Sequence, residues 1–267
     1  MENMNMKLAE MCWQEAETHL KNTDNVIVIP VGSTEQHGSI GPLGTDWMIP
    51  QEFARRIADQ SGVIVAPPVC YGVAPQHINF PGTVDIGLET MSVLIERMLL
   101  CWHRHGARRF CIINGHGGND PAIDRAGLKL YRMGALVSLV DWWSIAPQLN
   151  KSWVTGHGDA QEVSAMMAIR PDIVKREYLK ENIIPPLTEN LVPFHMSRAR
   201  FRGAAVRVIR DVRDTASTGG FGGKDSSEAN PEWGREMMAG MTEWIGDFIQ
   251  EFRKVSLPED RPETYSI

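Results

Sequence analysis

Short runs of apolar residues alternate along the chain with longer segments in which apolar and polar positions are mixed. Continuous apolar runs predict buried strands at Val26–Gly32, Val63–Pro68, Phe110–Asn114 and Ala135–Asp141. The longer segments repeat apolar residues every three or four positions, which predicts helices at Leu8–Leu20, Pro50–Gln60, Leu88–His105, Asp120–Gly134, Gln161–Ile169 and Glu232–Phe252. We therefore expect an α/β fold with helices on both faces of a sheet.

Composition narrows the classes of function. The 267 residues are 43% hydrophobic and 22% charged, which is typical of a globular chain and excludes disordered and collagen-like ones. We expect residues 1–267 to form one domain. The 27 basic and 33 acidic residues leave a formal net charge of −6, so the surface as a whole attracts neither nucleic acid nor an anionic membrane. A small-molecule substrate is the expected partner.

The cysteines and the N-terminal residues bear on location. Cys12, Cys70, Cys101 and Cys111 stand singly without a CxxC pair, which excludes a disulfide scaffold and predicts buried free thiols in a reducing compartment. No window holds about 18 uninterrupted apolar residues, and the first twenty residues interleave acids with apolar positions. We expect a cytoplasmic protein that does not span a membrane.

The densest group of potential metal ligands follows the first predicted strand. Glu35 and His37 are two positions apart, so in an extended segment their side chains point the same way, and Asp46 returns after a turn rich in glycine and proline. One imidazole and two carboxylates suit a divalent ion such as Zn²⁺, Mn²⁺ or Fe²⁺, and a bridging aspartate could hold two ions. The alternative is structural, with Glu35 capping a helix and Asp46 acting as the N-cap of the next one.

A second group stands where the strand Phe110–Asn114 runs into Gly115-His116-Gly117-Gly118-Asn119. His116 is expected at the carboxyl end of that strand, where ligand crevices of α/β sheets lie, and Asp120 is expected to cap the following helix, with Pro121 in its first turn. A glycine-rich turn could instead cradle a phosphate, but this one matches neither GxGxxG nor GxxxxGK[ST].

A third group opens the predicted helix Gln161–Ile169. His157 could act as a general acid or base, and Glu162 could be a further metal ligand or the partner that orients a water. A capping box, with Asp159 as N-cap and Glu162 at the third helical position, explains the same residues without a catalytic role.

Three segments follow one another along the chain: GSTEQHG…PLGTD, NGHGGN and H-x4-E-x-S. Together they resemble the creatininase, or creatinine amidohydrolase, family, and the resemblance runs from Val26 to Ser164. The resemblance implies a three-layer αβα sandwich with a mostly parallel central sheet, one or two divalent metal ions per chain (Zn, Mn or Fe), and a homo-oligomer, often a hexamer. It also implies roles for particular side chains: the metal ligands would be Glu35, His37, Asp46 and His116, with Asp46 bridging two ions, and His157 would line the catalytic pocket.

One departure from the family concerns the residues after His116. Creatininase proper has a tyrosine and a metal-binding glutamate where this chain has Gly117 and Gly118. A motif with glycine at both positions resembles other branches of the family: formamide deformylases, the mycofactocin-precursor peptidase and hydrolases that open an oxidised inositol ring. We infer that Glu162 supplies the missing carboxylate, which argues against creatinine as the substrate.

The resemblance implies a metal-dependent hydrolase in which an activated water attacks the carbonyl of a small molecule and His157 carries the proton. We expect either the ring opening of a cyclic diketone of the 3-dehydro-scyllo-inosose type or the hydrolysis of an amide or formamide. A non-catalytic metal- or nucleotide-binding protein is the alternative from a different class, because the same α/β scaffold serves both.

Candidate pocket walls are fewer and less specific. His77 could bind substrate or close its own loop, and Trp142 and Trp143 would point opposite ways if the strand continued, so we expect Trp142 at the pocket and the other in the core. The arginine-rich stretch 198–213 could be a solvated strand face, a subunit contact, or a site that recognises an anionic or polyhydroxyl substrate. Residues 211–231, rich in Gly, Ser and Asp, are expected to form a long loop.

Overall fold

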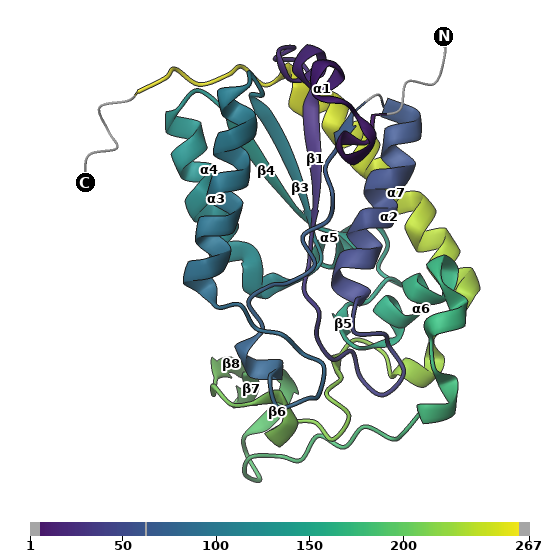
Figure 1. Cartoon of the computed structure of the whole chain (residues 1–267). Helices are drawn as coiled ribbons and strands as arrows, with labels where there is room; N and C mark the ends of the chain where they lie inside the picture. The colour runs from purple at the N-terminus through teal and green to yellow at the C-terminus, as the bar shows by residue number, and fades with distance from the viewer. Residues whose placement is uncertain (1–5, 62, 262–267) are drawn as a thin grey trace.

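A four-stranded parallel sheet in the order β2-β1-β3-β4 lies at the centre of the computed structural model, which describes residues 6–61 and 63–261 (Figure 1). Strands β1 (Val26–Val31), β3 (Arg109–Asn114) and β4 (Leu136–Asp141) pair along their whole length. β2 is shorter than predicted, only Ile64–Val65, because Pro67 and Pro68 follow it and have no N–H to donate to a ladder. The expected α/β architecture is confirmed.

Helices cover both faces of this sheet, which makes three layers (Figure 1). One face packs against α2 (Thr45–Ser61), α6 (Ala160–Ile169) and α7 (Pro231–Lys254). The opposite face packs against α3 (Leu88–Arg104) and α4 (Asp120–Arg132). Among the described residues, no helix is long and apolar enough to cross a membrane.

The alternation of side chains along each strand divides the interior into two cores. Val26 and Val28 of β1 face the core of α2, α6 and α7, whereas Ile27 and Ile29 face the core of α3 and α4. All four side chains are at most 1% exposed, which is why β1 reads as a continuous apolar run rather than an alternating one.

Several helix boundaries differ from the sequence prediction. The segment expected to be one helix at 8–20 is a 3-10 turn, Leu8–Glu10, followed by α1 (Trp13–Leu20). Helix α2 begins five residues before the expected Pro50 and contains that proline in its second turn. Asp120 is the first residue of α4 rather than its N-cap, and its carboxylate accepts a hydrogen bond from the side chain of Asn114 instead.

The prediction of buried thiols is correct only for Cys111, which lies within β3. Cys12 and Cys101 are exposed and Cys70 is partly buried, because an apolar stretch of sequence also includes positions on the solvent side of a helix or in a loop. All four cysteines are free.

Two smaller sheets lie beyond the carboxyl ends of the central strands, in the lower part of Figure 1. An antiparallel sheet is formed by β6 (Val192–His195), β7 (Arg198–Phe201) and β8 (Ala204–Arg207). The segment expected to be a long loop, 211–231, contains short 3-10 turns and β9 (Phe221–Gly222), which pairs with β5 (Gly156–His157).

The order of the central strands creates a crevice between β1 and β3. From β1 the chain passes through α2 to β2 on one side, and from β2 it passes through α3 to β3 on the other side of β1. Ligands of open α/β sheets bind at such a reversal, outside the carboxyl ends of the strands.

Candidate metal centre

The loop after β1 and the first turn of α2 bring Glu35, His37 and Asp46 together, and each side chain is at most 2% exposed. Nε2 of His37 lies 2.7 Å from Oδ1 of Asp46, while Nδ1 of His37 donates to the carbonyl oxygen of Glu35 at 2.9 Å. The backbone contact orients the ring so that Nε2 faces the carboxylates. Glu35 caps no helix, so the structural alternative for this residue is wrong.

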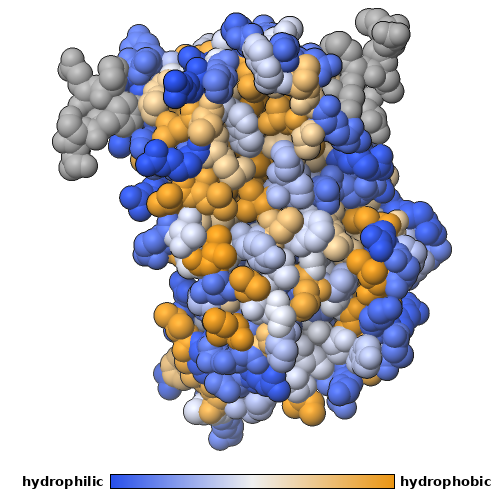
Figure 2. All heavy atoms as spheres, viewed as in Figure 1, coloured by the Kyte–Doolittle hydropathy of each residue, from blue (hydrophilic) through white to orange (hydrophobic). Residues whose placement is uncertain are grey.

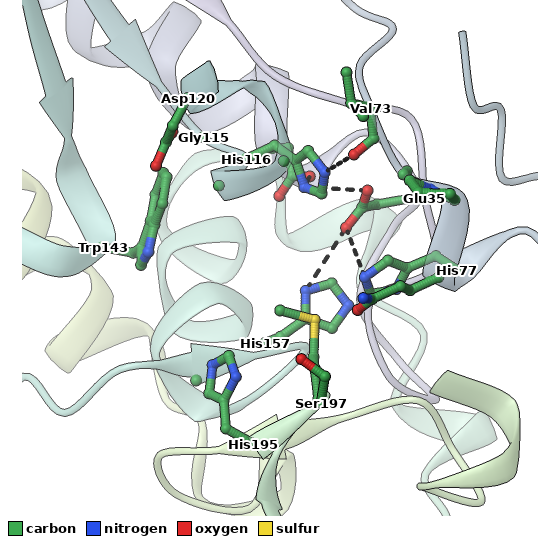
Figure 3. A pocket seen from close by; sticks show the side chains of 18 of the residues that line it. Glu35, Val73, His77, Gly115, His116, Asp120, Trp143, His157, His195 and Ser197 are labelled. Carbon is green, nitrogen blue, oxygen red and sulfur yellow. Dashed lines mark hydrogen bonds and ion pairs between the residues drawn. The ribbon is translucent and has the colours of Figure 1, made fainter. Parts of the chain in front are cut away.

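His116 approaches the same carboxylates from the end of β3 (Figure 3). Its Nδ1 lies 3.2 Å from Oε2 of Glu35 and 3.3 Å from Oδ2 of Asp46. Its Nε2 donates to the carbonyl oxygen of Val73 at 2.7 Å, which fixes the ring with Nδ1 toward the carboxylates.

His157 and Glu162 complete the group from β5 and α6. Asp159 is the N-cap of α6, since its Oδ1 accepts from the backbone N–H groups of Gln161 and Glu162. Oε2 of Glu162 accepts from the backbone N–H of Gly158 at 2.6 Å and lies 3.7 Å from Nε2 of His37. The expected capping box is thus only half formed: Asp159 caps α6, but the side chain of Glu162 accepts from Gly158 rather than from Asp159 and lies beside the ligands.

Unpartnered buried oxygens indicate that this group is built for a cation. Both carboxylate oxygens of Glu35 and Oδ2 of Asp46 are buried without a hydrogen-bond partner among the described residues, a costly arrangement unless a cation is bound. Three sets of donor atoms lie close enough to hold a metal ion: Glu35–Asp46–His116, His37–Asp46–Glu162 and Glu35–His37–His157. Imidazole nitrogens with carboxylate oxygens suit Zn²⁺, Mn²⁺ and Fe²⁺.

In the absence of a cation, the imidazoles carry the compensating charge. Burial opposes protonation of His37, but Asp46 and Glu162 raise its pKa to about 10. Burial likewise opposes protonation of His116, yet Glu35 and Asp46 raise its pKa well above the usual range. Burial raises the pKa of Glu162 to about 7, an effect that nearby His37 partly offsets.

His157 behaves differently from the other two imidazoles. Burial, followed by the neighbouring His77 and His37, holds the pKa of His157 well below its usual value. The ring is therefore neutral at physiological pH, as a group that accepts a proton must be.

Gln36, which the sequence interpretation did not assign a role, lies between two imidazoles of this cavity. Its amide Nε2 is 2.8 Å from Nδ1 of His77 and 2.9 Å from Nε2 of His157. Its backbone carbonyl, which can only accept, lies 2.9 Å from the same Nε2 of His157. The two contacts on this nitrogen require opposite tautomers: an Nε2–H of His157 donates to the carbonyl, and the amide of Gln36 then donates to His77 instead. In that tautomer Nδ1 of His157 is an acceptor, 3.8 Å from Oε1 of Glu35.

A cavity of about 470 Å³ opens onto these carboxylates and imidazoles (Figure 3). His77 lies inside it, with Nε2 3.6 Å from Oε1 of Glu35. Trp143 lines the wall, whereas Trp142 lies in the core beside Phe53 and is 1% exposed, so the expectation that Trp142 binds substrate is wrong. The reason is that β4 ends at Asp141 and the short helix α5 (Trp142–Leu149) begins there, which removes the alternation of a strand.

Four of the six arginines in the stretch 198–213 fall into two groups. Arg198 and Arg207 line the cavity, together with His195 and Ser197 of the same small sheet. In contrast, Arg200 stacks on the ring of Phe194 at 4.5 Å and Arg202 on that of Phe201 at 5.2 Å, away from the cavity.

The two glycines after His116 are not equivalent. A Cβ on Gly118 would lie 2.0 Å from the carbonyl oxygen of Val73 and 2.5 Å from Nε2 of His116, whereas a Cβ on Gly117 would meet only Trp143, at 3.5 Å. This backbone therefore leaves no room for a side chain at 118, and Glu162 is the nearest additional carboxylate in the three donor sets.

Comparison with known proteins places this geometry in a family. The family model described as creatinine amidohydrolase matches residues 9–249. The chain is 34% identical to the mycofactocin precursor peptide peptidase of Mycobacterium ulcerans over 65% of this chain and 70% of that protein. It is 29% identical to the creatinine amidohydrolase of Pseudomonas putida, over 68% and 77% of the two chains, and 29% identical to the 3-dehydro-scyllo-inosose hydrolase of Thermotoga maritima, over 63% and 57%.

Solved structures of creatininases have the same fold as this chain. A structure described as "Creatininase Mn" superposes with a TM-score of 0.75 at 26% identity, covering 94% of this chain and 100% of the other. A mutant creatininase described as the Zn-Zn type gives a TM-score of 0.73 at 26% identity over 94% and 99%. The fold, the order of the three motifs and the buried donor sets at the ends of β1 and β3 thus have one common explanation: the chain belongs to the creatininase family of metal-dependent hydrolases.

Proposed function

We propose that this chain hydrolyses a small carbonyl compound at a centre of two divalent cations that share Asp46. The observation that carries the proposal is the set of three buried, unpartnered carboxylate oxygens, two on Glu35 and one on Asp46, facing imidazole nitrogens. One cation would be held by Glu35, Asp46 and His116, and the other by His37, Asp46 and Glu162. When bound, such cations polarise a carbonyl and lower the pKa of a water that attacks it.

The acid–base work falls to His157. Its neutral ring presents Nδ1 toward Glu35, while Nε2 is held by the carbonyl of Gln36. Nδ1 can take a proton from the attacking water and return it to the leaving atom, a nitrogen in an amide or a carbon in a cyclic diketone. Gln36 keeps the ring in the orientation that this transfer needs, and His77, beside the same carboxylate, is placed to contact substrate.

Two classes of substrate fit this mechanism, cyclic diketones and amides or formamides. The similarity to an inosose hydrolase supports ring opening of an oxidised inositol, and the similarity to a precursor peptidase and a creatinine amidohydrolase supports cleavage of an amide or formamide. Both substrates offer a carbonyl to the same centre. A panel of cyclic diketones, formamides and short peptides, assayed with the metal-loaded protein, decides between a C–C and a C–N bond.

The test of the centre is the metal content of the purified chain by inductively coupled plasma mass spectrometry. We expect about two equivalents in the wild type, loss of most of both in Asp46→Asn, and loss of about one in Glu162→Gln. Asp120→Asn is the matched control, since Asp120 lines the cavity but belongs to none of the three donor sets. If the Asp46→Asn variant keeps the metal content and the turnover of the wild type, the assignment of Asp46 as a metal ligand is overturned.

We also infer that residues 1–267 act as one domain in a cytoplasmic homo-oligomer, of which a hexamer is one form. The four free cysteines support a reducing compartment. Exposed apolar side chains on α3 and α4 support association, among them Val93 at 60% and Leu128 at 54% exposed. Figure 2 shows apolar residues gathered over the upper left of the molecule, where α3 and α4 lie in Figure 1. Multi-angle light scattering of the full chain measures the assembly, and a monomer at micromolar concentration would refute it.

A further inference from the structure

Two arginines stand directly opposite each other on the wall of the cavity. Arg198 of β7 and Arg207 of β8 are register partners in the small antiparallel sheet, and both line the cavity that opens onto the carboxylates. Like charges at directly opposed positions destabilise a sheet. Among the described residues, no carboxylate lies within 4.0 Å of either guanidinium, so no ion pair offsets the repulsion. Both side chains are exposed, so solvent screens part of this repulsion, and the two cations are paired where they face the site.

The surroundings of the pair are neutral or cationic. His195 is largely buried beside it, and burial together with the Arg198 guanidinium lowers the pKa of this imidazole, which keeps it neutral. Ser197 is 8% exposed and lines the same wall. Its carbonyl accepts from the backbone N–H of Val208, which ties the start of β7 to the end of β8. This wall therefore presents donors without a nearby acid.

The opposite side of the cavity carries the acids. Glu35, Asp46 and Glu162 lie there, and the two cations of the proposed centre would neutralise their charge. The cavity of about 470 Å³ extends from these carboxylates to the arginines, so one bound molecule can contact both ends. A molecule with a carbonyl and a separate negative charge would complement both groups.

Two other arginines of this region do not line the cavity and serve as a comparison. Arg200 and Arg202 pack over the rings of Phe194 and Phe201 and lie outside the cavity. All four arginines are exposed, so the solvated-face interpretation fits Arg200 and Arg202, and the cavity lining is what distinguishes Arg198 and Arg207.

We propose that Arg198 and Arg207 bind an oxyanion of the substrate, a carboxylate or a phosphate, while its carbonyl lies at the centre. A guanidinium forms two parallel hydrogen bonds with either group, and two opposed guanidinium groups can donate to one oxyanion from both sides. This inference rests on the proposed function and narrows it to anionic substrates. It favours an amide with a terminal carboxylate or phosphate over neutral creatinine or a neutral cyclic diketone.

The first test measures anion binding without the centre. The full chain is depleted of metal with a chelator, dialysed, and titrated with inorganic phosphate and separately with acetate by isothermal titration calorimetry. We expect binding in the wild type that weakens by at least about tenfold in the double variant Arg198→Gln/Arg207→Gln, because a charge-assisted hydrogen bond contributes about 1.5–3 kcal/mol. Arg202→Gln removes the same charge from the same sheet and should bind as the wild type does. The stronger of the two anions identifies phosphate or carboxylate as the preferred group.

The second test uses the metal-loaded protein and matched compounds: N-formylglycine, its neutral amide N-formylglycinamide, and N-formylaminoethyl phosphate. We expect kcat/KM for an anionic compound to exceed that for the neutral one by about tenfold or more, and the double variant to lose this preference, whereas Arg202→Gln should keep it. A preference that survives in the double variant, or anion binding equal to that of the wild type, would overturn the proposal. If no compound is hydrolysed, formamide hydrolysis is excluded as the proposed function, and the titration alone then decides the arginine pair.

Discussion

Asp46 is the residue on which both halves of the candidate centre depend. Its Oδ1 lies 2.7 Å from Nε2 of His37 and its Oδ2 lies 3.3 Å from Nδ1 of His116, so each oxygen faces a different imidazole. Burial would raise its pKa, but the neighbouring His37 and His116 lower the pKa to about 2, and the carboxylate is ionised at any physiological pH. A negatively charged group with two divergent oxygens is the natural bridge between two cations.

Gly118 is predicted to be as important as a ligand, although it has no side chain. A methyl group there would collide with the carbonyl oxygen of Val73 and with Nε2 of His116, and so would break the 2.7 Å hydrogen bond that orients His116. We expect Gly118→Ala to bind metal about 10–100-fold more weakly, as the loss of an orienting contact does. Gly117→Ala is the control, since its methyl group meets only Trp143 at 3.5 Å. Titration of metal-depleted protein with Zn²⁺ measures both; equal affinity in the two variants would contradict the role of Gly118.

At the scale of elements, the packing of α6 on α7 positions Glu162 and the turn that carries His157. The helices meet at Gly234, near the start of α7, where a Cβ would lie 1.8 Å from the carbonyl oxygen of Ser164 in α6. The side chain of Ser164 also accepts a hydrogen bond from the backbone N–H of Asn230, the N-cap of α7. At Gly234 the two helices therefore meet backbone against backbone, with no space for a methyl group.

Gly234→Ala should lower the free energy of unfolding by about 1–3 kcal/mol, because the added methyl group must push the helices apart. The same substitution at Gly127 in α4 should be neutral or stabilise by up to about 1 kcal/mol, since its Cβ would meet Val137 at an ordinary 3.4 Å and alanine favours helix. Urea unfolding followed by circular dichroism measures both variants. Equal stability of the two would show that α6 and α7 adjust to the methyl group without cost.

At the scale of the whole molecule, the fold and the centre have separate sources of stability. The two apolar cores lie on the faces of the central sheet, whereas Glu35, Asp46 and Glu162 gather beyond its carboxyl edge. Removal of a cation leaves three buried carboxylates close together, but it removes no apolar contact. The chain should thus stay folded without metal, at a lower stability.

Chelation is therefore expected to lower the melting temperature without loss of secondary structure. A cation present at about 1,000 times its dissociation constant stabilises the folded state by about 4 kcal/mol, which corresponds to roughly 10 °C in a chain of this size. Differential scanning calorimetry with and without EDTA gives the shift, and far-ultraviolet circular dichroism reports the fold. Asp46→Ala should not respond to EDTA. If EDTA leaves the melting temperature of the wild type unchanged, the bound metal does not stabilise the folded state.

Much of this molecule was decided by local sequence. Strands β1, β3 and β4 and helices α3, α6 and α7 lie within a few residues of their predicted bounds, because apolar periodicity and glycine or proline stops act over short distances. The convergence of Glu35 with His37 is likewise local, since two positions apart in an extended loop they share one side.

The tertiary structure alone decided which distant side chains reach the cavity. The end of β4 at Asp141 put Trp143 on the wall and Trp142 in the core, and the pairing of β7 with β8 brought only Arg198 and Arg207 of the arginine stretch to the site. The role of Gln36 between two imidazoles depends on rings that enter from β5 and from the loop before α3. Periodicity determines which face of an element is buried, but the partner it is buried against, and the space left between them, follow from how the elements pack.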